Sequence, residues 1–184
     1  MRLPLQLLLV SLALLASAAQ PALSASEREA AIRAAFLYRL SFFVHWPEGE
    51  LADPGAPISV CVVAAGESEV FRQLELGARR WKIGERPMRV QLLAGGAALE
   101  GCHIAYIEGD LPAARLPGQL VVVESMARLD GIGDLALVAT RTEDGGTRLG
   151  FHADRQRLAR ARFSLSSQLM QLLSFRAERP GDPS

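Results

Sequence analysis

Two cysteines and three histidines are the side chains of this sequence best suited to metal binding, redox chemistry or nucleophilic catalysis. No Cys-x-x-Cys pair occurs, and the surroundings of Cys61 and Cys102 are apolar rather than electropositive, which disfavours a redox relay. His45, His103 and His152 share no ligand-type spacing with one another, with cysteine or with acidic residues. The sequence therefore predicts no metal site and assigns these histidines structural roles.

One motif has the form of a dinucleotide-binding fingerprint. The stretch Gly131-Ile-Gly133-Asp-Leu-Ala136 fits G-x-G-x-x-A. The true fingerprint lies between a strand and a helix, because the helix N-terminus holds the pyrophosphate. Here a strand-like apolar run follows instead, so the glycines are predicted to form a turn. We expect no cofactor.

Other catalytic signatures are also missing from the sequence. It contains no Gly-x-Ser-x-Gly elbow, no His-Glu-x-x-His and no phosphate-binding loop. None of its serines has a base at a readable spacing, although a triad built from distant residues leaves no signature in one sequence. We therefore predict that the protein is not an enzyme and has no catalytic residues.

The charges of the chain are balanced and interspersed. Twenty basic residues face twenty acidic ones, which gives a formal net charge of +0 at pH 7. Binding of nucleic acid normally requires a basic patch or stripe, and the sequence has no basic block. We therefore predict no nucleic-acid partner.

The N-terminus has the form of an export signal. Met1-Arg2 is a short positive start, an apolar stretch follows from Leu5 to Ala16, and small residues then offer a cleavage site. About a dozen apolar residues are too few to cross a bilayer, which takes about 20. We predict a signal peptide over 1–25, cut between 18 and 25, with no direct membrane insertion. One domain over 26–176 and a disordered tail over 177–184 complete the chain.

Export bears on the two cysteines. Two thiols in an exported chain usually oxidise to a disulfide, which favours a bond between Cys61 and Cys102. Closing a loop of about 40 residues would restrict the unfolded chain by roughly 4 kcal/mol in the chain-entropy treatment. The alternative is two separate buried thiols that pack as small hydrophobes.

An aromatic-rich helix opens the predicted domain. Ser26 and Glu29 have the spacing of a capping box, and an apolar stripe follows over Ile32, Phe36, Leu40 and Phe43/Val44. Proline cannot continue a helix, so Pro47 predicts a helix end near His45-Trp46. The stripe is typical of a helix packed on a sheet, and the Trp46 end is a candidate for contact with a partner.

The remaining pattern alternates strands and helices. Strands are predicted at 58–64, 88–93, 102–107, 119–124, 135–140 and 147–151, and helices at 68–79, 154–161 and 164–175. Glu143-Asp-Gly-Gly146 joins the last two strands as a hairpin. Apolar strands that alternate with helices favour a mainly parallel sheet. We therefore expect a single-domain α/β sandwich with a mixed sheet of about six strands and a late β-hairpin.

The last predicted helix suggests a contact surface. Leu165, Leu169, Leu172 and Leu173 form one stripe that should pack on the sheet. Met170 and Phe175 fall outside this stripe, and methionine is common at adaptable binding surfaces. We predict that Met170, Phe175 and Trp46 form or border a partner-binding patch. The alternative is a second layer of ordinary core.

Several blocks of the sequence resemble the YfiR family of small periplasmic proteins. They are Ala34-Ala-Phe-Leu-Tyr-Arg-Leu40 with Phe43-Val-His-Trp-Pro47, Ile58-Ser-Val-Cys-Val62, Cys102-His-Ile-Ala-Tyr-Ile107, and Phe163-Ser-Leu-Ser-Ser-Gln-Leu-Met-Gln-Leu-Leu173. Two departures stand out. The chain lacks the second disulfide of the best-known member, and it has Phe151-His-Ala-Asp154 where the family tends to have Phe-x-Ile-Asn.

This resemblance implies a non-enzymatic periplasmic repressor in cyclic di-GMP signalling, and hence in biofilm control. The implied partner is the periplasmic sensor part of an inner-membrane diguanylate cyclase, and an outer-membrane lipoprotein would relieve the repression by sequestering the repressor. A second copy of the chain is a further candidate partner. The alternative is a periplasmic small-molecule-binding module that serves a sensor histidine kinase or a transporter.

Overall fold

The computed structural model describes residues 24–47, 49–109, 115–143 and 145–175. The predicted signal peptide falls almost wholly, and the predicted tail wholly, outside these residues. The helices are α2 (Ala25–Leu40), α3 (Glu69–Ala78), α4 (Met126–Leu129), α5 (Arg155–Arg160) and α6 (Ser167–Leu172). The strands are β1 (Val44–His45), β2 (Ile58–Val63), β3 (Lys82–Ile83), β4 (Arg86–Leu93), β5 (Ile104–Ile107), β6 (Leu120–Val123), β7 (Leu135–Arg141), β8 (Thr147–Ala153), β9 (Ser164–Leu165) and β10 (Ser174–Phe175).

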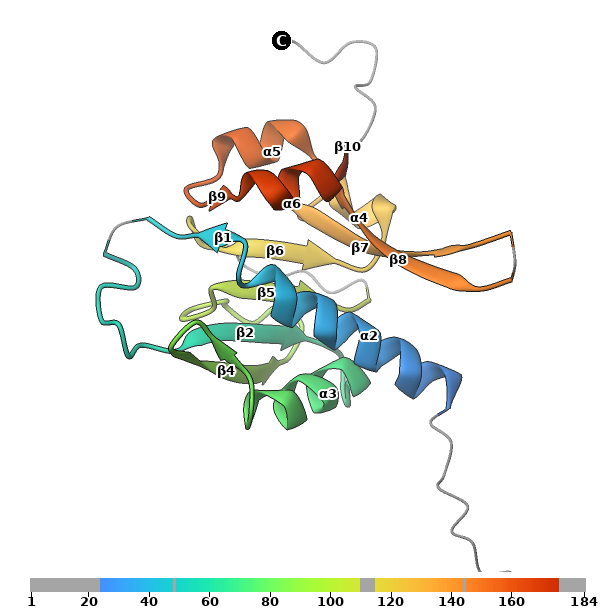
Figure 1. The fold of residues 1–184 in the computed structure, drawn as a ribbon, viewed down its shortest axis with the longest axis horizontal. Helices are drawn as coiled ribbons and strands as arrows, with labels where there is room; N and C mark the ends of the chain where they lie inside the picture. The colour runs from blue at the N-terminus through green and yellow to red at the C-terminus, as the bar shows by residue number, and fades with distance from the viewer. Residues whose placement is uncertain (1–23, 48, 110–114, 144, 176–184) are drawn as a thin grey trace, which may run out of the picture.

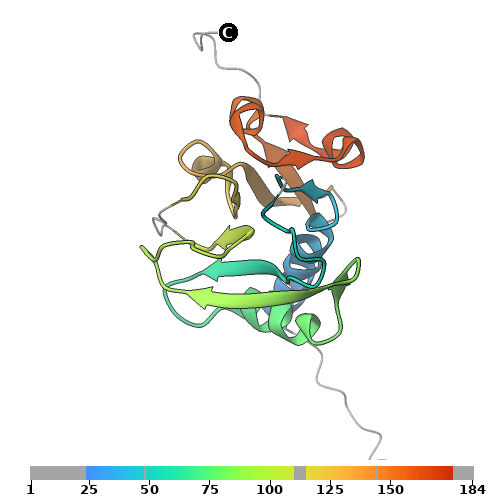
Figure 2. The same ribbon diagram turned by 90° about the vertical axis from the view of Figure 1, so that its left-hand side faces the viewer.

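The described strands form one large mixed sheet and one small ribbon (Figures 1 and 2). The large sheet has the order β10-β8-β7-β6-β5-β2-β4-β3, and the ribbon pairs β1 with β9. Strands β4, β2, β5, β6 and β7 are parallel, whereas β8 runs antiparallel to β7. The predicted mixed α/β fold is confirmed, and β3 and β10 add two short edge strands to the six that the sequence indicated.

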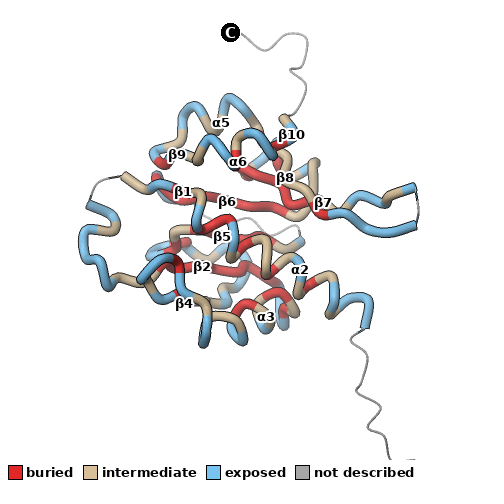
Figure 3. The backbone as a smooth tube through the Cα atoms, viewed as in Figure 1, coloured by how far each residue is buried: buried red, intermediate tan, exposed pale blue. Residues whose placement is uncertain are grey.

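The central strands are buried on both faces, which explains their continuous apolar runs (Figure 3). On one face Val60, Val62 and Ile104 pack with residues of α2 and α3. On the other face alternate residues, among them Cys61 and Val63, pack with the segments before β5 and around α4. The molecule therefore has two apolar cores, one on each side of the sheet.

Helix α2 lies across the first face (Figure 1). Its buried residues are Ala30, Ala34, Leu37 and Leu40, and the two alanines allow close approach to the sheet. The capping box is formed by Ser24 and Glu27, so the predicted box at Ser26 and Glu29 was wrong. A signal-peptide cut after Ala18 would keep this cap, whereas a cut after Ala25 would remove it.

Two predicted helices differ from the structure for the same reason. Helix α2 ends at Leu40 because Val44 and His45 then pair with Leu165 and Ser164 of β9. The predicted last helix, 164–175, is divided into β9, α6 and β10. The apolar residues recur at helical spacing in these segments, although β1, β9 and β10 form strand pairs. Ile32 and Leu172 are exposed, although both predicted stripes placed them inside; the buried face of α2 is formed by Ala30, Ala34, Leu37 and Leu40 instead.

The turn before β7 follows the prediction. Strand β7 begins at Leu135, directly after the glycines of the G-x-G-x-x-A motif. A Cβ on Gly133 would lie 2.8 Å from Cγ2 of Val123, so close packing against β6 requires glycine there. The β7–β8 hairpin then extends beyond the rest of the sheet (Figure 1).

Candidate functional site: an apolar groove near the C-terminus

A cavity of about 290 Å³ lies among the last elements of the domain. We call it the C-terminal groove. Its walls come from α5, the segment after α5, β9, α6 and β10 (Figure 1). Residues with apolar side chains dominate the lining, which consists of Arg155, Leu158, Ala159, Phe163, Ser164, Leu165, Met170 and Phe175.

Local hydrogen bonds fix the walls of this groove. Asp154 caps α5 by accepting a hydrogen bond from the backbone N–H of Arg157 at 2.9 Å. Ser166 caps α6 in the same way, through the N–H of Leu169 at 3.3 Å. Phe175 is held in β10 opposite Ala153 of β8. Three short elements are thereby set around one apolar space, with the buried Phe163 at its base.

The groove brings together two of the three predicted contact residues. Met170 and Phe175 both line it, and both are half-buried. The guanidinium carbon of Arg155 lies 4.4 Å from the centre of the Phe175 ring, which is cation–π geometry. Arg155 thus places a positive charge on the rim of an apolar groove.

Trp46, the third predicted contact residue, does not line the groove. It follows β1, and its ring packs edge-on against His103 with 5.4 Å between the ring centres. Its indole Nε1 is buried and has no hydrogen-bond partner among the described residues. The neighbouring ribbon still links the two places, since His45 pairs with Ser164, which lines the groove.

A second apolar surface lies near the end of α2. The Tyr38 ring stacks on Trp81 with 4.5 Å between their centres, and Phe42 meets Tyr38 edge-on at 5.2 Å. Phe42 remains exposed. Tyr38 of α2 and Phe42, two residues after the helix, therefore form a surface cluster with Trp81, which helical spacing could not reveal because Trp81 lies far away in the sequence.

The two cysteines and His103 have structural partners. Cys61 and Cys102 form a disulfide that ties β2 to the segment before β5, as the export signal led us to expect. The Nδ1 atom of His103 accepts a hydrogen bond from the Ser59 N–H at 3.0 Å. Burial, assisted by the positive charge of Arg86, lowers the pKa of His103. This histidine therefore stays neutral at physiological pH.

Arg155 is the groove residue that the sequence did not suggest. The segment 155–162 carries four arginines, three of them in α5, and that density is the signal from which a charged rim could have been inferred. The pairing of β10 with β8 decides which of these arginines contacts the Phe175 ring. Only the three-dimensional structure supplies that information.

No described helix has the length and apolar character needed to cross a membrane.

No curated protein matches the chain. A family model described as DUF4154, YfiR/HmsC-like, matches residues 30–173. This match covers both cores, the disulfide and nearly all of the C-terminal groove. It indicates a periplasmic regulator in diguanylate cyclase signalling rather than an enzyme. The chain belongs to the YfiR/HmsC-like family.

Proposed function

We propose that the protein is a periplasmic, non-enzymatic repressor of an inner-membrane diguanylate cyclase, and that it binds the periplasmic sensor part of that enzyme. Family membership supports the regulatory role. The observation that carries the contact surface is the C-terminal groove, in which Met170 and Phe175 remain partly exposed beside the positive charge of Arg155. Such a groove suits an apolar side chain that is flanked by acidic residues on the partner.

Repression by this mechanism is a linkage effect. The repressor must bind the inactive form of the cyclase more tightly than the active form, because a protein with equal affinity for both forms shifts nothing. An outer-membrane lipoprotein that sequesters the repressor would then relieve the inhibition by lowering its free concentration. Formation of a homodimer through the same groove would compete with binding to the cyclase.

The groove is tested by Met170→Glu, with Leu76→Glu as the matched control. Leu76 is exposed on α3, on an element that does not line the groove. We expect Met170→Glu to weaken binding to the purified periplasmic part of the cyclase at least tenfold, because a buried unpaired carboxylate is costly. Its melting temperature should stay within a few degrees of the control.

A Met170→Glu protein that unfolds would show that this residue belongs to the core. In that event Arg155→Glu tests the groove, because Arg155 is exposed and its replacement reverses the charge of the rim. Arg155→Glu should also weaken binding. Full affinity in a folded Met170→Glu protein, or in Arg155→Glu, would place the contact surface elsewhere. The cluster of Phe42, Tyr38 and Trp81 would then be the next surface to test.

The second candidate function is a small-molecule-binding module that serves a sensor histidine kinase or a transporter. It is favoured by a second, polar cavity of about 630 Å³, which is lined by residues of α5 and of the segment 115–118. A neighbouring gene for a membrane cyclase with a periplasmic loop favours repression. A neighbouring kinase or transporter gene favours the ligand-binding module.

A further inference from the structure

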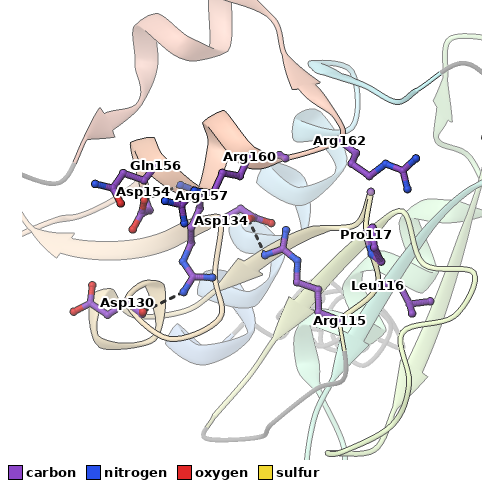
Figure 4. A pocket seen from close by; sticks show the side chains of 12 residues that line it. Arg115, Leu116, Pro117, Asp130, Asp134, Asp154, Gln156, Arg157, Arg160 and Arg162 are labelled. Carbon is purple, nitrogen blue, oxygen red and sulfur yellow. Dashed lines mark hydrogen bonds and ion pairs between the residues drawn. The ribbon is translucent and has the colours of Figure 1, made fainter. Parts of the chain in front are cut away.

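A polar cavity of about 630 Å³ lies where β6 and β7 begin. One wall consists of α5 and the two residues after it, and the opposite wall is the segment 115–118 (Figure 4). The turn before β7 closes the space between them. In Figure 4, Arg115 reaches from the second wall toward Asp134, which stands at the start of β7. This volume falls in the usual range for sites that bind small molecules.

Asp134 is the buried charge of this cavity. Its side chain is 0% exposed, and its Oδ2 accepts a hydrogen bond from the Val121 N–H at 2.9 Å. Its Oδ1 lies 2.8 Å from Nη1 of Arg115. Burial raises the pKa of Asp134, while the Val121 N–H and Arg115 oppose that rise. Arg115 and Asp134 are within ion-pair distance of each other inside the cavity.

Arg157 and Asp154 are also committed to internal contacts. The Nη2 atom of Arg157 donates to the backbone oxygens of Asp130 and Gly131, at 3.2 and 2.6 Å. Asp154 is occupied as the cap of α5. These contacts hold α5 against the turn before β7. They shape the cavity and leave both side chains little capacity for a ligand.

Arg160 and Arg162 remain as the uncommitted cations of the cavity. Both residues line the cavity and both are exposed. Neither side chain forms a hydrogen bond or an ion pair with another described residue. Across from them, Leu116 and Pro117 provide an apolar surface. Arg160 and Arg162 thus both border a space whose buried carboxylate, Asp134, is already paired, and which Asp130 and Asp154 also line.

We propose that this cavity binds a small anion through Arg160 and Arg162, with a phosphate group as the ligand. A guanidinium presents planar, paired donors that match phosphate oxygens. The Arg115–Asp134 pair adds no net repulsion, and a non-polar part of the ligand would rest against Leu116 and Pro117. The site lies outside the C-terminal groove, so the proposal does not depend on the contact surface proposed above.

The test is a titration of the mature protein with inorganic phosphate, in which binding is monitored by NMR of the arginine side chains. Sodium chloride is adjusted to keep the ionic strength constant. The wild-type protein should show saturable binding. The double variant Arg160→Gln, Arg162→Gln should bind at least about tenfold more weakly, since hydrogen bonds between charged groups are the strong ones. Because both residues are exposed, its melting temperature should be unchanged.

Arg155→Gln is the matched control. It removes one arginine charge from α5, the helix that carries Arg160, but its guanidinium lies over Phe175 in the other groove, so phosphate affinity should not change. Absence of saturable binding of phosphate to the wild-type protein, or an equal loss of phosphate affinity in Arg155→Gln and in the double variant, would overturn the proposal.

Vesicles that contain phosphatidylglycerol test whether the phosphate group belongs to a lipid or to a free ion. Binding to vesicles without binding to free phosphate would overturn it in favour of a membrane surface.

Discussion

A single arginine fastens the opening helix to the sheet. Arg33 donates from Nη1 to the Tyr106 hydroxyl at 3.1 Å and to the Leu137 backbone oxygen at 3.0 Å. Its other nitrogens contact Glu29, one turn earlier on α2. These bonds join α2 to β5 and β7, so the helix cannot slide along the sheet without breaking them. Arg33 thereby helps to fix the position of the aromatic residues that follow it.

Burial of Tyr106 gives this link a measurable property. Burial raises the pKa of Tyr106 to about 12, although the nearby charge of Arg33 opposes the rise. The chain has only two tyrosines. In a Tyr38→Phe variant, we therefore expect absorbance at the phenolate band to report one tyrosine with a pKa of about 12.

The same shift sets a stability change at alkaline pH. The folded state keeps the Tyr106 proton more tightly than the unfolded state, whose pKa is about 10. Protonated Tyr106 therefore favours the folded state, relative to ionised Tyr106, by roughly 3 kcal/mol in the free energy of unfolding. This stability is fully present below about pH 10 and is lost as the pH rises toward about 12. Tyr106→Phe should remove this dependence. A tyrosine that titrates near pH 10 in Tyr38→Phe would contradict the buried link.

At this scale the sequence singled out some residues of the C-terminal groove and missed others. Met170 and Phe175 were recognisable because they fall outside the apolar stripe of their segment. Arg155 was not, because its contact with Phe175 depends on the pairing of β10 with β8. Trp46 was expected near the same patch, yet it packs on His103. Tertiary neighbours of this kind leave no local pattern.

Among the elements, the long buried strands were predictable and the two-residue strands were not. The six residues of β2 are all buried, and their apolar run reads directly as a central strand. By contrast, β1 and β9 consist of two residues each, and their pairing depends on backbone contacts between distant segments. Apolar residues at helical spacing on both sides therefore led to helices that were too long.

The disulfide is the covalent link between elements. It joins Cys61 in β2 to Cys102, at a sequence separation of 41 residues. Within the described residues no free cysteine remains. We expect the double variant Cys61→Ala, Cys102→Ala to lose stability by up to roughly 4 kcal/mol, because its unfolded chain is less restricted. Thermal unfolding measured by circular dichroism would show a lower melting temperature.

Thiol titration supplies the complementary measurement. Mature protein isolated from the periplasm and denatured without reductant should have no titratable thiol. Repression by the wild-type protein should also weaken under reducing conditions, since the sequence offers no other cysteine pair. Two free thiols in the denatured protein would contradict a stable bond at this position.

For the molecule as a whole, the sequence indicated the class of fold better than its surfaces. Alternating strands and helices predicted the mixed sheet, and the late hairpin was marked by its glycines. The two cavities were not predictable. The C-terminal groove and the polar cavity lie on opposite sides of α5. The polar cavity combines the segment 115–118 with residues of α5, and the groove depends on short elements without a sequence signal.

The placement of the two cavities on either side of α5 suggests how binding of an anion and binding of a partner protein could influence each other. Helix α5 contributes Arg155 to the C-terminal groove and Arg160 to the polar cavity. An anion bound on one side would affect a partner on the other only if it bound the partner-bound and free forms with different affinities. Comparing partner affinity with and without phosphate measures that coupling directly.

The cellular concentration of cyclic di-GMP is the most direct measure of whether the protein represses a diguanylate cyclase. Deleting the gene in a strain that still expresses the membrane cyclase proposed as its partner should raise the cyclic di-GMP concentration and biofilm formation, because the inhibited enzyme is released. Restoring the wild-type gene should return both to their original levels. Unchanged cyclic di-GMP in the deletion strain, with the cyclase present and active, would contradict the account.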